Sequence, residues 1–188
     1  MSILSIVHIP MSNPFITDHC LRQECHDVSE QDIRSTWMNK LLYDMFQTLY
    51  AGPSGIGLSA NQVGVLKKVC IIDIKRDGKK PLVLFNPSYE SADDELTDSS
   101  EVCLSVPDRK ATVSRYKSIV LTYQDTECNF QKQTLTGFIA IAAQHEIDHL
   151  YGKLYIDLLA EKDVNLIENY EGYHISMAKK AMGAITNE

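Results

Sequence analysis

Hydrophobic residues recur at three- and four-residue steps over residues 32–50. The positions are Ile33, Trp37, Leu41, Leu42, Met45, Phe46 and Leu49. This spacing is typical of an amphipathic helix with one face on a core, and the glycine and proline of 52–55 predict its end. A second helix is expected over about 138–151, where apolar residues share faces and Gly152 can end the helix.

Between the two helices, apolar runs predict strands at 68–74 and 82–85, and a run rich in β-forming residues predicts a further strand at 118–123. Residues 76–79, Arg-Asp-Gly-Lys, indicate a hairpin turn between the first two strands. The polar segment 91–100 is expected to be an exposed loop leading into 101–107. After Asp157 the chain becomes polar, and weaker helical segments are expected at 161–170 and 175–184.

The length of 188 residues favours one domain over residues 1–188, with a less certain tail from about 160. A formal net charge of -7 argues against direct nucleic-acid binding and against a membrane surface, because both require clustered Lys and Arg. No long apolar run could span a bilayer, and residues 1–10 are too short and uncharged for a signal peptide. The cytoplasm is therefore the expected compartment.

The five cysteines form no CxxC pair, so neither a disulfide framework nor a zinc ribbon is indicated. Cys70 lies in the apolar run Val-Cys-Ile-Ile and is expected to be a core residue, as free cysteines commonly are.

The second predicted helix carries His145-Glu-Ile-Asp-His149, which fits the pattern HExxH. Residues four apart lie one turn above each other on a helix, so both imidazoles can reach one metal ion. Glu146 would then lie beside the metal, where it can take a proton from a polarised water and return it to a leaving amine. Metal-assisted hydrolysis of an amide-like bond is the predicted chemistry. The alternative is a chance match whose histidines make ordinary hydrogen bonds.

Two histidines leave a catalytic metal short of a ligand, because such sites usually hold three protein ligands. One candidate is a downstream acid, as in many zinc peptidases, and Glu168 lies at a plausible separation from His149. The other is Cys103, whose thiolate would favour iron or zinc. From the residues alone both candidates stay open.

Three segments in order closely resemble the motifs of the peptide deformylases. They are Gly55-Ile-Gly-Leu-Ser-Ala-Asn-Gln62, Glu101-Val-Cys-Leu-Ser-Val-Pro107 and Gln144-His-Glu-Ile-Asp-His-Leu150. The resemblance extends over about 33–159. It implies an α+β fold with mostly antiparallel strands around a central helix that carries HExxH. It also implies hydrolysis of the N-formyl group from formyl-methionyl peptides of nascent proteins at the ribosome, with release of formate.

The resemblance further implies a role for each matching residue. Cys103, His145 and His149 would bind the metal, with ferrous iron expected and zinc or nickel possible substitutes. Glu146 would be the general acid and base, while Gln62 and the backbone amide of Leu104 would stabilise the oxyanion. The residues implied in peptide binding are Gly55 and Gly57, for close passage of the backbone, and Ile56, Glu101, Phe138, Ile141 and Ala142, for a methionine-sized pocket.

The sequence departs from the family pattern at three of these positions. Val102 stands where the family has glycine, Ser59 replaces a usual alanine, and Phe138 replaces a smaller aliphatic residue. A β-branched side chain beside the metal could narrow the cleft or move the Leu104 amide. Val102 therefore keeps open an alternative function: a deformylase-like metalloprotein with a shifted substrate or a non-catalytic formyl-peptide-binding role.

Overall fold

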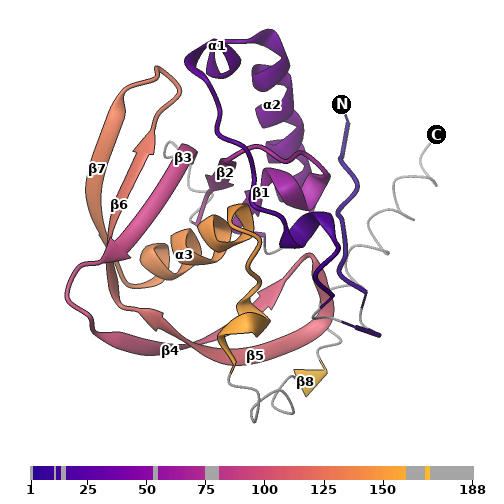
Figure 1. Ribbon diagram of the computed structural model, residues 1–188, viewed down its shortest axis with the longest axis vertical. Coiled ribbons are helices and arrows are strands. Elements are labelled where there is room, and N and C mark those ends of the chain that lie inside the picture. Colours follow the sequence, from indigo (N-terminus) through magenta and orange to yellow (C-terminus); the bar gives the residue numbers. More distant parts are fainter. Residues whose placement is uncertain are drawn as a thin grey trace.

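Two antiparallel sheets and a helix that contacts both form the framework of the chain (Figure 1). The computed structural model describes residues 2–10, 12–13, 16–52, 55–74, 81–159 and 168–169. The helices are α1 (Glu30–Ile33), α2 (Thr36–Ala51) and α3 (Phe138–Leu150), with short 3-10 turns η1 (Cys20–Arg22), η2 (Ala60–Val63) and η3 (Tyr155–Leu158). The strands are β1 (Gly57–Ser59), β2 (Val69–Ile72), β3 (Leu82–Ser91), β4 (Leu96–Cys103), β5 (Val106–Tyr116), β6 (Ser118–Gln124), β7 (Phe130–Thr136) and β8 (Glu168–Asn169).

The larger sheet has the strand order β1-β2-β3-β6-β7, and the smaller sheet has the order β4-β5-β8. Neighbouring strands are antiparallel throughout both sheets. In Figure 1, α3 lies between the larger sheet and the long β4–β5 hairpin. It contacts β1, β2, β3 and β7 on one side and β5 on the other. The expected mixed fold with mostly antiparallel strands is confirmed.

The helix predicted over 32–50 is divided into α1 and α2. The Ser29 and Ser35 side chains each accept a hydrogen bond from a backbone amide three residues on, from Asp32 N and Met38 N. Such serine caps satisfy amides that have no partner within the helix, so each serine starts a new helix. The expectation of one continuous helix was wrong at its start, and the predicted end at Gly52 is confirmed.

Helix α3 agrees with the prediction for 138–151 to within one residue. It begins after Gly137, whose φ of 66° suits glycine, and it ends before Gly152, whose φ is 73°. A side chain at residue 152 would also meet the Arg22 carbonyl oxygen at 2.4 Å. Near its middle, Gln144 exchanges hydrogen bonds with the backbone of Tyr116, which ties α3 to β5.

The predicted strands at 68–74, 82–85 and 118–123 correspond to β2, β3 and β6, but the loop expected over 91–100 was wrong. Strand β3 continues to Ser91 and β4 begins at Leu96, where it pairs with Tyr116 of β5. Strands β4 and β7 have many exposed polar residues, and their alternation carries little hydrophobic signal.

Several expectations for the C-terminal part and the first hairpin fall on residues that the structure does not describe. They are the turn at 76–79, most of the helix at 161–170 and the helix at 175–184. Glu168 and Asn169 are described, and they form β8, paired with Lys110 and Arg109. A helix at those two residues was therefore a wrong prediction.

Two hydrophobic clusters lie near the residues of the site. One cluster, which includes Cys70, Ala143 and Ile147, lies between α3 and the larger sheet. Another joins Cys103 and Val106 to Leu154 and its neighbours beside β5. Cys70 is fully buried, which confirms its expected place in the core. Close packing against the larger sheet restricts α3, and this matters because α3 supplies both histidines of the site.

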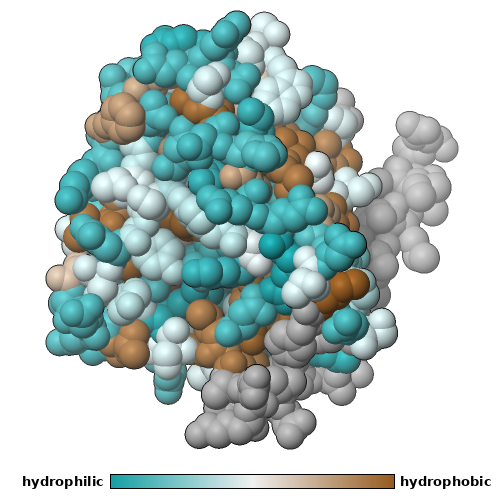
Figure 2. Space-filling view, viewed as in Figure 1, coloured by the Kyte–Doolittle hydropathy of each residue, from teal (hydrophilic) through white to brown (hydrophobic). Residues whose placement is uncertain are grey.

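The exterior in Figure 2 is mostly hydrophilic, with hydrophobic residues in small, separate patches on the face shown. Within the described ranges, none of the helices has the length and apolar character needed to cross a membrane.

Candidate metal centre and its cavity

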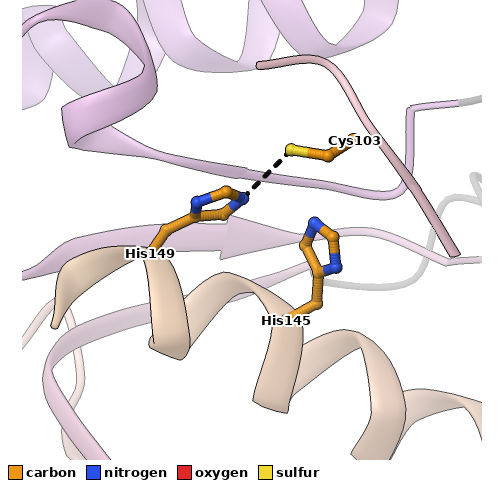
Figure 3. Close-up of side chains that lie close together, drawn as sticks. All are labelled: Cys103, His145 and His149. Carbon is orange, nitrogen blue, oxygen red and sulfur yellow. Dashed lines mark hydrogen bonds between the residues drawn. The ribbon is translucent and has the colours of Figure 1, made fainter. Parts of the chain in front are cut away.

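Two histidines of α3 and one cysteine of β4 converge on a single point. His145 and His149 lie one helical turn apart, with ring centroids 5.0 Å from each other. Cys103, the last residue of β4, faces both rings from the opposite side (Figure 3). The Cys103 Sγ lies 3.2 Å from His149 Nε2, and the ligand atoms of all three residues lie within 4.8 Å of one another.

This donor set fits a transition-metal ion. A first-row ion lies about 2.1 Å from imidazole nitrogen and about 2.3 Å from thiolate sulfur, so it can bridge atoms this close together. Sulfur and imidazole nitrogen together favour zinc or iron over magnesium and calcium. Glu168, the other candidate ligand, lies on β8, and Cys103 is the residue that the structure brings to the two histidines.

A buried ion network orients His145. The Nδ1 atom of His145 lies 2.8 Å from Glu101 Oε2, which leaves Nε2 for the metal. Arg115 donates to both oxygens of Glu101, at 2.8 and 3.0 Å, and to Asp148 at 2.5 Å. Burial on its own would raise the pKa of Glu101, but the hydrogen bonds from Arg115 and His145 outweigh burial and lower the pKa to about 2. Glu101 is therefore a charged, fixed partner of the histidine.

The two imidazoles differ in their proton affinity. Burial would lower the pKa of His145, yet its hydrogen bonds with Cys103 and Glu101 outweigh burial and raise the pKa well above the usual value. Burial lowers the pKa of His149 well below its usual value, and the charges of His145 and Arg115 lower it further. These directions favour the neutral form of His149, which a metal ligand requires, and at His145 a bound cation would replace a proton.

The Glu146 carboxylate is buried between α3 and β1. The Ser59 hydroxyl lies 2.7 Å from Glu146 Oε2 and 2.7 Å from the Glu146 backbone oxygen. Gly57 provides the room for this side chain, because a Cβ there would lie 2.5 Å from Glu146 Oε1. Burial raises the pKa of Glu146, and His145 and the Ser59 hydrogen bond partly offset that rise. A carboxyl group with a raised pKa is suited to accept and return a proton.

Gln62 lies in η2 and joins β1 to the metal ligands. Its Oε1 accepts a hydrogen bond from Ser59 N at 2.9 Å, and its Nε2 points at Cys103 Sγ, 3.5 Å away, and at Ser105 Oγ, 3.2 Å away. The amide donors thus face the centre. Leu104, half buried, lies in the turn between β4 and β5, next to the cysteine.

These residues surround a cavity of about 290 Å³. Every residue predicted for the site lies on its wall except His149, which is fully buried behind it. The predicted wall residues are Gly55, Ile56, Gly57, Gln62, Glu101, Cys103, Leu104, Phe138, Ile141, Ala142, His145 and Glu146. The structure adds Ser99, Ser100 and Val102 to the same wall. The three segments that carry the predicted site thus meet at one cavity.

Val102 lines the cavity with a side chain that is 39% exposed. Val102 is not among the described residues with left-handed backbone angles. Valine therefore fits this position without that form of backbone strain. Phe138, at the first position of α3, is 57% exposed. Two of the three departures from the family pattern, Val102 and Phe138, are therefore on the exposed part of the cavity wall, while the third, Ser59, is fully buried.

Sequence reasoning missed the residues that support the ligands. Arg115 lies on the same buried face of β5 as Ala111 and Val113. A charged residue at such a position indicates a buried ion pair, and this could have been noticed in the sequence. Asn61, which donates from Nδ2 to the His149 backbone oxygen at 2.5 Å, carried no such signal.

A family model described as polypeptide deformylase matches residues 14–165. A peptide deformylase of Cellvibrio japonicus is 40% identical over 157 residues, which cover 84% of this chain and 86% of the relative. The crystal structure of a peptide deformylase from Legionella pneumophila aligns with a TM-score of 0.75 and 29% identity, covering 100% of both chains. A class I type b peptide deformylase from Acinetobacter baumannii, with Met-Ala-Ser bound, aligns with a TM-score of 0.74 and 25% identity over 84% of this chain and 99% of that one.

Proposed function

The chain belongs to the peptide deformylase family, and from this premise we propose that it removes the N-formyl group from formyl-methionyl peptides. Water is the second substrate, and formate and a free amino terminus are the products. The observation that carries the proposal is the convergence of Cys103, His145 and His149 beside the Glu146 carboxylate, on and just behind the wall of one cavity.

Each side chain of the site has a chemical role in this proposal. Cys103 Sγ and the two imidazoles hold the metal, which supplies Lewis-acid polarisation when bound. Glu146 takes a proton from the attacking water as the C–O bond forms, and it gives the proton to the leaving amine as the formyl C–N bond breaks. The amide of Gln62 and the backbone N–H of Leu104 donate to the formyl oxygen as negative charge develops on it.

The remaining residues of the wall bind the peptide. Gly55 and Gly57 let the substrate backbone approach β1 closely. The apolar part of the pocket would take the methionine side chain, and its residues are Ile56, Phe138, Ile141, Ala142 and the stem of Glu101. The bound Met-Ala-Ser in the Acinetobacter baumannii structure supports a peptide of this kind as the ligand of the cavity.

The proposal also includes details that membership of this family does not establish. They are ferrous iron as the resident metal, with zinc or nickel as substitutes, and nascent chains at the ribosome as the substrate pool. They also include the cytoplasm as the compartment, one domain over residues 1–188, and α3 as the central helix of the fold. The thiolate ligand supports iron or zinc, and the contacts of α3 with both sheets support its central place.

The alternative of a shifted substrate or of binding without turnover is not favoured. It depended on Val102 distorting the site, but Gln62 and Glu146 are both held by hydrogen bonds with Ser59 next to the proposed ligands. A site used only for binding would not need Glu146 beside the metal.

The test is formate release from formyl-Met-Ala-Ser by protein prepared without oxygen and loaded with ferrous iron. Glu146→Ala should keep its metal and lose turnover by a factor of about 10²–10⁴, since it lacks the proton acceptor. Asp44→Ala is a matched control, because Asp44 is as buried as Glu146 at 5% exposure but lies on α2. Turnover that is equal in all three proteins would refute the proposed role of Glu146, and no formate from the metal-loaded wild type would refute the proposed function.

A further inference from the structure

Strand β1 presents two alternate residues to the side chain of Glu146. Gly57 and Ser59 point to the same face of the strand, because side chains alternate along it. Gly57 leaves a space that the Glu146 side chain fills, with Oε1 and Cγ at 2.5 and 2.6 Å from where a Cβ would be. Ser59 contacts the other carboxylate oxygen, Oε2, at 2.7 Å. Gly57 thus leaves room for the Glu146 side chain, and Ser59 makes a hydrogen bond with it.

The Ser59 hydroxyl bridges the two ends of the same residue. Its oxygen lies 2.7 Å from both the backbone oxygen and the Oε2 atom of Glu146, and its one hydrogen can be donated to either. A carboxylate that rotates away from this position loses its contact with the hydroxyl. Ser59 is fully buried, so water does not compete for either contact.

The backbone of Ser59 holds the other catalytic side chain. Ser59 N donates to Gln62 Oε1 at 2.9 Å, and this contact turns the amide nitrogen of Gln62 toward Cys103. The hydroxyl and the backbone amide of one residue therefore fix Glu146 and Gln62 independently. A substitution that removes only the hydroxyl leaves the Gln62 contact in place.

We propose that Ser59 is a positioning residue of the active site, whose hydroxyl holds the Glu146 carboxylate in the orientation that proton transfer requires. The inference rests on the proposed function, in which Glu146 moves the proton. Proton transfer depends on distance and angle, so a carboxylate that can rotate away spends less time in the productive geometry.

A purely structural role is the competing explanation, because a buried hydroxyl that bonds a helix carbonyl also joins α3 to β1. A structural role predicts a loss of stability with unchanged turnover per folded molecule. A positioning role predicts a lower kcat with unchanged KM and unchanged metal content, because substrate and metal contact other residues.

The experiment compares iron-loaded wild type with Ser59→Ala and Ser59→Cys in formate release, metal content and thermal unfolding. Thr48→Val is the matched control, since Thr48 has a buried hydroxyl that donates to the Asp44 backbone oxygen on α2, away from the cavity. We expect kcat to fall about tenfold in Ser59→Ala, with KM and metal content as in wild type, and to fall less in Ser59→Cys, which keeps a weak donor. Thr48→Val should lose stability only.

A second readout does not need turnover. A crystal structure of Ser59→Ala should show the Glu146 carboxylate rotated or in two conformers, with Gln62 still bonded to residue 59. An unchanged kcat in Ser59→Ala, an equal fall in Thr48→Val, or Glu146 in its original single position would each overturn the inference. A wild-type protein without activity would instead refute the proposed function, and the position of Glu146 in the variant would still decide the role of Ser59.

Discussion

The floor of the cavity and its rim are built in different ways. The floor, defined as the lining residues Gln62, Cys103 and Glu146 together with Ser59 and His149 buried behind them, is at most 8% exposed. Hydrogen bonds link its polar atoms. The rim, defined as Val102 and Phe138, is 39% and 57% exposed and presents apolar side chains. The two departures at the rim, Val102 and Phe138, leave the interactions of the floor in place. We therefore expect the floor to determine the chemistry and the rim to determine access and selectivity.

The rigidity of the floor comes from long-range contacts. Gln144 joins α3 to β5, Ser59 joins β1 to α3, and Arg115 of β5 holds the acids on both neighbouring elements. Residues at the rim have no comparable polar anchors. Substitutions in or beneath the floor should therefore change stability or kcat strongly, while substitutions at the rim should have small effects on kcat/KM.

The largest effect is expected beneath the floor, from Arg115→Met. Loss of the Arg115 guanidinium leaves the Glu101 and Asp148 carboxylates buried without their cation. This should lower the free energy of unfolding by about 3–5 kcal/mol. Lys117→Met, directly after the same strand, is the control. Its pair with Glu95 is exposed to solvent, so its loss should lower the free energy of unfolding far less than the loss of Arg115. Denaturant unfolding measures both, and equal losses would contradict the importance of this network.

A smaller effect, confined to turnover, is expected from Gly57→Ala. The new Cβ would lie 2.5 Å from Glu146 Oε1, so the carboxylate must move. We expect kcat to fall about 100-fold with the metal still bound. Gly64→Ala is the contrast, because its Cβ meets nothing closer than 4.0 Å while its φ of 82° disfavours alanine. That variant should lose stability and keep its kcat, and a kcat of wild-type size in Gly57→Ala would show that Glu146 tolerates displacement.

The smallest effect is expected at the rim, from Val102→Gly. If the valine side chain obstructs the entrance, its removal should raise kcat/KM on formyl-methionyl peptides by less than about tenfold. Val102→Gly both removes the side chain and makes the backbone more flexible. Val102→Ala separates these two effects, since it shortens the side chain without adding the backbone freedom of glycine. Steady-state kinetics on both variants measure the effect, and unchanged rates in both would show that Val102 does not obstruct the cavity.

The parts of the site that sequence could predict are those within one element. His145 and His149 share a helical face because of their spacing, and the apolar period around them predicted α3 correctly. Cys103 was different, because its approach to His149 depends on the β4–β5 pairing and on how α3 packs. Only the resemblance to a family distinguished it from Glu168.

The residues that sequence missed lie where local signals are weak or contradictory. Strand β4 begins among exposed polar residues, so its pattern predicted a loop. Arg115 is a charged residue on the buried face of a strand, and its partners are 14 and 33 residues away. Ser59 was visible as a departure from the family pattern, but its contact with Glu146 follows only from the packing of β1 against α3.

The account depends most on Cys103 as the third ligand, and the most direct test is metal content per chain in Cys103→Ala. Cys128→Ala is the matched control, because both cysteines are 8% exposed and only Cys103 faces the histidines. After loading with ferrous iron and removal of excess metal, Cys128→Ala should hold as much metal as wild type and Cys103→Ala should hold little. Full metal occupancy in Cys103→Ala would contradict the assignment of the metal centre.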